Sequence, residues 1–173
     1  MSYYTVHQNQ LVVTSNPPDG AVPFVEGVKT LLPPLVTNLH ESLRQWNGVA
    51  RTPGPVTPER IWFDGAGTLS FRFGAKYKPL PLTQVGLAPA LAAWLVLLDH
   101  YMETFVVVAR ARAVWSVDEL AAALPFVTPG YLPPKLLRHT NGSWSRTAHA
   151  VAAAVADGAL AGAPQDRHWK ESF

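Results

Sequence analysis

The sequence predicts a mainly helical α+β domain with two β-hairpins, a long buried central helix near residues 88–112 and three or four shorter helices. Apolar residues recur every three or four positions in several segments, which is typical of helices with one buried face. Two pairs of short β-rich runs flank turn residues. The 173 residues are 48% hydrophobic and 15% charged, enough for a core without metals or disulfides. We expect one globular domain over residues 1–161 and a polar tail over residues 162–173.

The two hairpins are predicted from runs of β-branched and aromatic residues around turn residues. Residues 3–8 and 11–14 flank a polar turn and predict an opening hairpin. Residues 60–63 and 68–73 flank a link that contains two glycines and predict a second hairpin. In the last of these runs apolar side chains alternate with polar ones, so we expect one buried face and one exposed face.

The central helix is predicted from the most apolar part of the chain. Residues 87–98 form an apolar run of about twelve residues, whereas a membrane-spanning helix needs roughly 18. Asp99, His100 and Glu103 then interrupt the run, and such groups are costly in lipid. The pattern therefore predicts a core helix and no membrane span.

The shorter helices are predicted from residues that start and stop helices. Proline is tolerated in the first helical turn, so Pro33-Pro34 marks one start. Ser116 and Glu119 have the spacing of a capping box, and Gly158 is a typical stop. Four helices are expected on this basis, at residues 33–47, 117–124, 135–139 and 145–157.

The composition and the motifs exclude several functional classes. The chain contains no cysteine, which excludes disulfides, thiolate metal sites and cysteine nucleophiles. The net charge is only +2, so no strong field steers nucleic acid to the chain. No phosphate-binding loop and no metal-ligand spacing of histidines is present, so we expect no cofactor and no metal. The first ten residues show no secretory signal pattern, and together with the absent cysteine this predicts a cytoplasmic protein.

Residues at the predicted periphery are the candidates for contact with a partner: Trp144, Trp169, Phe173, Arg110 and Arg112. Exposed aromatic residues are enriched where partners bind. The two arginines stand at the end of the central helix, where they would contact phosphate or, more simply, stabilise the negative end of the helix dipole. For Trp169 and Phe173, contact with a partner and packing onto the domain are both open.

An enzyme with a site assembled from scattered residues is the alternative function, and its candidate residues are His100, Glu103 and His139. His100 and Glu103 share one helix face and could bind a metal or act as an acid–base pair. The simpler interpretation is that they form the polar edge of a buried helix. A third alternative, a subunit associated with nucleic acid, rests on the isoelectric point near 9.0 and the arginines.

One stretch, residues 56–74, reads VTPERIWFDGAGTLSFRFG and resembles the part of protein kinases that joins the catalytic loop to the magnesium-binding loop. Pro58-Glu59 match the Pro-Glu of that family, residues 64–67 match its turn, and Phe73-Gly74 match its Phe-Gly. The resemblance covers residues 35–110. It implies that the long helix corresponds to the buried central helix of the kinase large lobe.

The same resemblance implies that phosphotransfer chemistry is absent. Pro55, Arg60 and Arg72 stand where the family has its catalytic aspartate, its metal-binding asparagine and its magnesium-binding aspartate. Proline cannot accept a proton, and arginine repels a metal ion. The leading hypothesis is therefore a non-catalytic, pseudokinase-like interaction or regulatory subunit that binds another protein chain in an intracellular complex.

Overall fold

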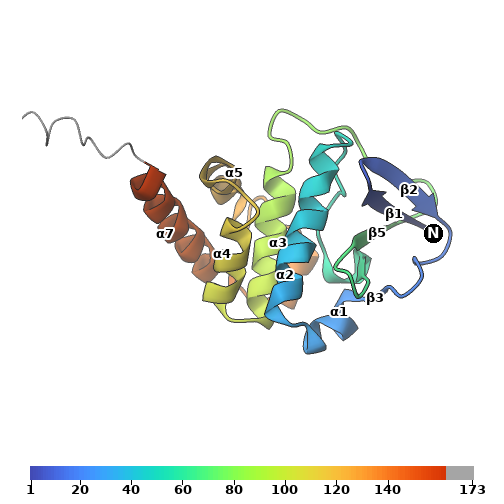
Figure 1. Ribbon diagram of the computed structural model, residues 1–173, viewed down its shortest axis with the longest axis horizontal. Helices are drawn as coiled ribbons and strands as arrows, with labels where there is room; N and C mark the ends of the chain where they lie inside the picture. The colour runs from blue at the N-terminus through green and yellow to red at the C-terminus, as the bar shows by residue number, and fades with distance from the viewer. Residues whose placement is uncertain (163–173) are drawn as a thin grey trace, which may run out of the picture.

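The computed structural model describes residues 1–162, in which one antiparallel sheet packs against a group of helices (Figure 1). The strands lie in the order β2-β1-β5-β4-β3, and each neighbouring pair is antiparallel. Their bounds are β1 Ser2–His7, β2 Gln10–Thr14, β3 Val22–Pro23, β4 Ile61–Phe63 and β5 Leu69–Phe73. The α-helices of the described part are α1 Phe24–Gly27, α2 Pro33–Arg44, α3 Ala88–Tyr101, α4 Thr104–Arg112, α5 Val117–Ala123, α6 Pro134–His139 and α7 Trp144–Gly162.

The predicted fold, a mainly helical α+β domain with two hairpins, is wrong in its arrangement, although the α+β class itself fits the structure. Both hairpins are present, but β1 pairs with β5, so that they form one five-stranded sheet together with β3. The structure is α+β, with 51% helix and 14% strand among the described residues. Tyr3, Tyr4 and Val6 are buried although they point to both faces of β1, which is the environment of an inner strand. The local alternation of residues cannot reveal a pairing between segments that lie far apart in the sequence.

The predicted helix over residues 88–112 is also wrong, because the chain leaves the helical conformation at Met102 (φ −142°, ψ 168°). It divides into α3 and α4. The buried carboxylate of Asp99 accepts hydrogen bonds from the hydroxyls of Thr104 on α4 and Thr147 on α7, the latter at 2.7 Å. A break after Tyr101 allows α4 to turn and bring its threonine to that carboxylate.

The last helix is longer than predicted, because α7 continues through Gly158 to Gly162. Gly158 is required for packing and does not stop the helix. A Cβ atom at this position would lie 2.4 Å from Cγ2 of Val117, so α7 and α5 approach each other more closely than a side chain would permit. The predicted capping box of α5 is confirmed, since Ser116 Oγ accepts from the Glu119 amide at 3.1 Å and Glu119 Oε1 accepts from the Ser116 amide at 3.1 Å.

Helix α3 is the centre of the core, as its apolar composition predicts. Residues 90–98 are all buried, and Trp94 packs edge-on against Phe24 with ring centroids 5.6 Å apart. On the sheet side, Trp46 packs against Phe71 of β5 at 5.5 Å. Among residues 1–162, no helix has the length and apolar character that crossing a membrane requires.

Candidate binding groove

The loops before and after the second hairpin are joined to each other by backbone hydrogen bonds beside α3. The Thr52 amide donates to the Leu80 carbonyl at 2.9 Å, and the Leu82 amide donates to the Ala50 carbonyl at 3.0 Å. These two bonds form an isolated antiparallel bridge between Arg51 and Pro81. The bridge fixes one side of a depression in the molecular surface.

Arg60 organises the same side of the depression through its guanidinium group. Its Nε donates to the carbonyl of Arg72 at 3.0 Å, Nη2 donates to that of Pro53 at 3.0 Å, and Nη1 donates to that of Pro55. The guanidinium carbon also lies 4.5 Å from the ring centre of Phe73. Burial lowers the pKa of Arg60 below its ordinary value. The side chain therefore acts as a half-buried cation held by backbone dipoles.

The opposite side is formed by α6 and by the loop before it. The amides of Tyr131 and Leu132 both donate to the Thr128 carbonyl, at 3.1 and 3.0 Å. This turn buries Leu132 and leaves Tyr131 66% exposed. At the other end of the wall, Lys135 Nζ lies 3.3 Å from Glu59 Oε1 and connects α6 to the first loop.

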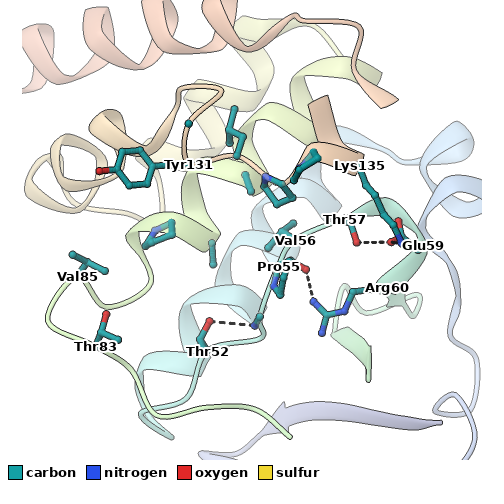
Figure 2. Close-up of a pocket in the computed structure, with 18 of the residues that line it drawn as sticks. Thr52, Pro55, Val56, Thr57, Glu59, Arg60, Thr83, Val85, Tyr131 and Lys135 are labelled. Atoms are coloured by element: carbon teal, nitrogen blue, oxygen red, sulfur yellow. Dashed lines mark hydrogen bonds and ion pairs between the residues drawn. The ribbon is translucent and has the colours of Figure 1, made fainter. Parts of the chain in front are cut away.

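Between these walls lies an open cleft of about 840 Å³, and a second hollow of about 490 Å³ lies next to it and shares Arg60 in its lining. We call the two together the loop groove. Figure 2 shows Tyr131 and Val85 at one end of the larger cleft and Lys135, Glu59 and Arg60 at the other. The prolines that line the groove are Pro55, Pro81, Pro89, Pro133 and Pro134.

The loop groove concentrates the positive charge of the chain. Among residues 1–162, five lysines and arginines line it but only one acidic residue does, Glu59. The five cations are Arg60, Lys76, Lys78, Lys135 and Arg138. Because the whole chain carries a net charge of only +2, the remainder of the molecule is slightly negative. The groove is thus suited to a ligand that carries negative charge.

Of the predicted partner-contact residues, three lie within the described part of the chain. Arg110 and Arg112 are two residues apart on α4 and point to different sides of the helix. Trp144 is partly buried and packs against the core. Trp169 and Phe173 lie outside the described residues.

Two of the residues predicted for an alternative enzymatic site do meet. The rings of His100 and His139 lie 5.2 Å apart, and the Tyr101 hydroxyl lies 2.5 Å from His139 Nε2. Burial, followed by the neighbouring His139 and Arg146, lowers the pKa of His100. Glu103 lines the same shallow hollow as His100. Within residues 1–162, no group of three or more histidine, cysteine or acidic residues could hold a metal ion.

Sequence reasoning missed the loop groove because its walls come from three separated segments. Each segment is rich in proline, at residues 53–58, 79–81 and 133–134. Such clusters usually indicate connections between elements, and nothing in one cluster points to the other two. The available signal was the proximity of prolines to exposed tyrosines and lysines, as in Lys76-Tyr77-Lys78.

Comparisons of the chain with protein-family models, with curated proteins and with solved structures gave no match.

Proposed function

We propose that this chain is a non-catalytic protein-interaction module and that the loop groove is the surface that binds its partner. The contacts of Arg60 are the observation that carries the proposal. Its guanidinium bridges the carbonyls of Pro53, Pro55 and Arg72, and no acidic group of residues 1–162 contacts it where the two loops meet. The charge of the guanidinium would repel a divalent metal there, and no carboxylate among residues 1–162 is in contact with it to bind one.

The proposal includes the kinase-like interpretation of residues 35–110. Under that resemblance Pro55, Arg60 and Arg72 stand at the three catalytic positions. The Arg60 side chain donates to the backbone carbonyls of the other two residues. This arrangement supports a kinase-like lobe in which Arg60, and no longer a bound metal, holds together the two loops that contain the catalytic positions. Such a module would retain a groove for a partner without transferring phosphate.

Calorimetric titration with magnesium-ATP tests the non-catalytic part of the proposal. We expect no heat of binding, because arginines stand at the positions where the kinase family has the asparagine and aspartate that hold magnesium-ATP. Binding in the micromolar range would overturn this part.

Site-specific crosslinking tests the interaction surface. The chain has no cysteine, so a single cysteine can carry a photoreactive label. We expect the label on Val85→Cys, inside the groove, to yield a discrete crosslinked protein in an extract of the organism that produces the chain. The matched control is Ala122→Cys, an exposed position on α5 outside the groove lining. Equal crosslinking from both positions would reject the groove as the binding surface.

A further inference from the structure

We propose that the loop groove binds an extended acidic segment of the partner protein, with an aromatic or aliphatic residue of that segment seated near Tyr131 and Val85. This inference rests on the proposed function, because it names the chemistry of the partner at the same groove. It follows from the charge, the apolar exposure and the shape of the groove.

The first argument is that most cations of the groove lack an ionic partner within the described part of the chain. The ion pairs of that part are Arg44–Glu119, Lys135–Glu59 and Arg146–Asp99. Among residues 1–162, Lys76, Lys78 and Arg138 therefore line the groove without a carboxylate in contact, and Arg60 is bound only by carbonyl oxygens. Carboxylates of a partner could form ion pairs with these cations. Complementary electrostatic potentials both attract a ligand and select it from others.

The second argument is the apolar surface between the cations. Tyr77, Leu80 and Val85 are 71%, 68% and 47% exposed, and all three line the groove together with Tyr131. Exposed aromatic and aliphatic residues can serve as contact points for apolar side chains of a bound segment, and aromatic residues are enriched at interfaces. A segment with both acidic and apolar residues would bury this surface and neutralise the lysines at the same time.

The third argument concerns the conformation of the bound segment. The two hollows share Thr52, Gly54, Pro55 and Arg60 in their linings, so they lie next to each other and one extended segment could contact both. Prolines in the walls lack an amide N–H and cannot donate to a bound backbone, which disfavours the addition of a strand. Grooves lined by aromatic residues bind extended segments in polyproline conformation, and Tyr77 and Tyr131 supply such residues here. A protein segment in polyproline or related extended form fits these conditions.

The distribution of charge favours a protein segment over nucleic acid. The end of the groove formed by Thr83, Val85 and Tyr131 is lined by uncharged residues in the described structure (Figure 2). A nucleic acid carries a phosphate at every nucleotide and would leave its charges unpaired along this end. An acidic segment can place its carboxylates at the lysines and its apolar residue at the uncharged end.

Fluorescence anisotropy with short labelled peptides tests the inference. One peptide carries four glutamates, a tyrosine and a proline; matched peptides carry glutamine or lysine in place of glutamate. We expect the glutamate peptide to bind about tenfold more tightly than the glutamine peptide. Its affinity should fall as NaCl is raised from about 50 to about 300 mM, because exposed charges are screened. A labelled oligothymidylate serves as the nucleic-acid probe and is expected to bind more weakly.

Matched variants locate the binding. The double variant Lys76→Glu with Lys78→Glu should lower the affinity for the glutamate peptide by about tenfold or more, because charge attraction becomes charge repulsion. Lys29→Glu changes an exposed lysine outside the groove lining and should alter affinity less than about twofold. Tyr131→Ser should weaken binding, whereas Tyr131→Phe should retain it.

Equal or tighter binding of the glutamine peptide, the lysine peptide or the oligothymidylate would overturn the inference. If this occurs while the Val85→Cys crosslink persists, the partner has another chemistry and the proposed interaction function stands. If the crosslink is also absent, the proposed function fails together with the inference. Loss of glutamate-peptide binding by Lys29→Glu would place the site elsewhere and also reject the inference.

Discussion

Asp99 and Arg60 are two charged residues that each connect three segments, but their surroundings are opposite. The Asp99 carboxylate is completely buried and is surrounded by donors: the hydroxyls of Thr104 and Thr147 and the guanidinium of Arg146, whose Nε lies at 3.2 Å. Its charge is paired within the fold.

Arg60 is held by carbonyl oxygens and has no carboxylate in contact among the described residues. Dipoles satisfy its hydrogen bonds without cancelling its charge. It also lines both hollows of the loop groove. A charge that is paired inside the protein contributes to the fold alone, whereas a charge held only by dipoles leaves an electrostatic potential that can attract an external ligand.

The largest expected effect comes from breaking the paired site. Asp99→Asn should lower the free energy of unfolding by about 3 kcal/mol. The asparagine amide cannot accept hydrogen bonds from all three donors, and the substitution also removes the ion pair with Arg146. Arg146 is 58% exposed at its side chain, so it can be hydrated once its partner is lost. Urea denaturation measures the change.

The matched control for Asp99 is Glu103, an exposed acid two residues beyond the end of α3. Glu103→Gln should change stability by less than about 0.5 kcal/mol. If both variants had the same effect, the Asp99 network would not be what joins α3, α4 and α7.

Removing the unpaired charge should have a smaller effect on stability and an additional effect on binding. Arg60→Met should lower the free energy of unfolding by about 2 kcal/mol, because hydrogen bonds from a charged donor to three carbonyls are lost. Arg60→Lys retains the charge but not the planar fork, so it should lose similar stability. In the anisotropy assay, however, the Arg60→Lys variant should preserve more of the salt-dependent attraction than the Arg60→Met variant. Identical affinities of the two variants for the glutamate peptide would show that the charge of Arg60 does not contribute to binding in the groove.

His40 extends the comparison to a buried group that the fold keeps neutral. It is completely buried between α2 and its neighbours, and its Nδ1 accepts from Trp115 Nε1 at 3.3 Å. Burial lowers the pKa of His40 from 6.5 to about 3. As pH falls, the unfolded chain therefore takes up the proton first, and folding stability declines between pH 6.5 and pH 3.

From pH 7 to pH 5 this difference should remove about 2 kcal/mol from the free energy of unfolding. Urea denaturation at the two pH values measures the loss. His40→Gln should be less stable at neutral pH but should lack this part of the pH dependence. His7→Gln, at an exposed position, serves as the control and should retain it. A pH dependence unchanged by His40→Gln would mean that another group titrates on unfolding.

Local patterns in the sequence predicted the elements whose causes are local. The capping box of Ser116 and Glu119, the proline start of α2 and the turns of both hairpins each involve residues close in the chain. The buried character of α3 was also predictable, because every residue from 90 to 98 is apolar.

The remaining features depend on contacts between distant segments. The pairing of β1 with β5, the break at Met102 and the continuation of α7 past Gly158 were missed for this reason. The loop groove was missed likewise, since its charge and its prolines are spread over residues 52–138. Of the predicted candidate residues within the described part of the chain, His100 and His139 are the two whose rings meet, and they do so outside the groove.

Alanine substitutions at Gly54 and Gly20 should differ least of all, and their difference distinguishes backbone strain from the displacement of Arg60. Gly54 and Gly20 both have φ of +77°, so a substitution by alanine strains each backbone to a similar extent. A Cβ atom at Gly54 would lie 3.2 Å from Arg60 Nη1, whereas a Cβ atom at Gly20 would have no neighbour within 4 Å. Gly54→Ala should therefore be about 0.5 kcal/mol more destabilising than Gly20→Ala by urea denaturation.

The same pair of glycine variants also reports on the groove. Gly54→Ala should weaken the binding of the glutamate peptide. The added methyl group would push the Arg60 guanidinium away from the carbonyls of Pro53 and Pro55, which hold it between the two hollows. Gly20→Ala should leave that affinity unchanged. If the two variants were equal in both stability and affinity, the position of Arg60 would be independent of the loop that surrounds it, and the contrast with the rigidly paired Asp99 would then lose its basis.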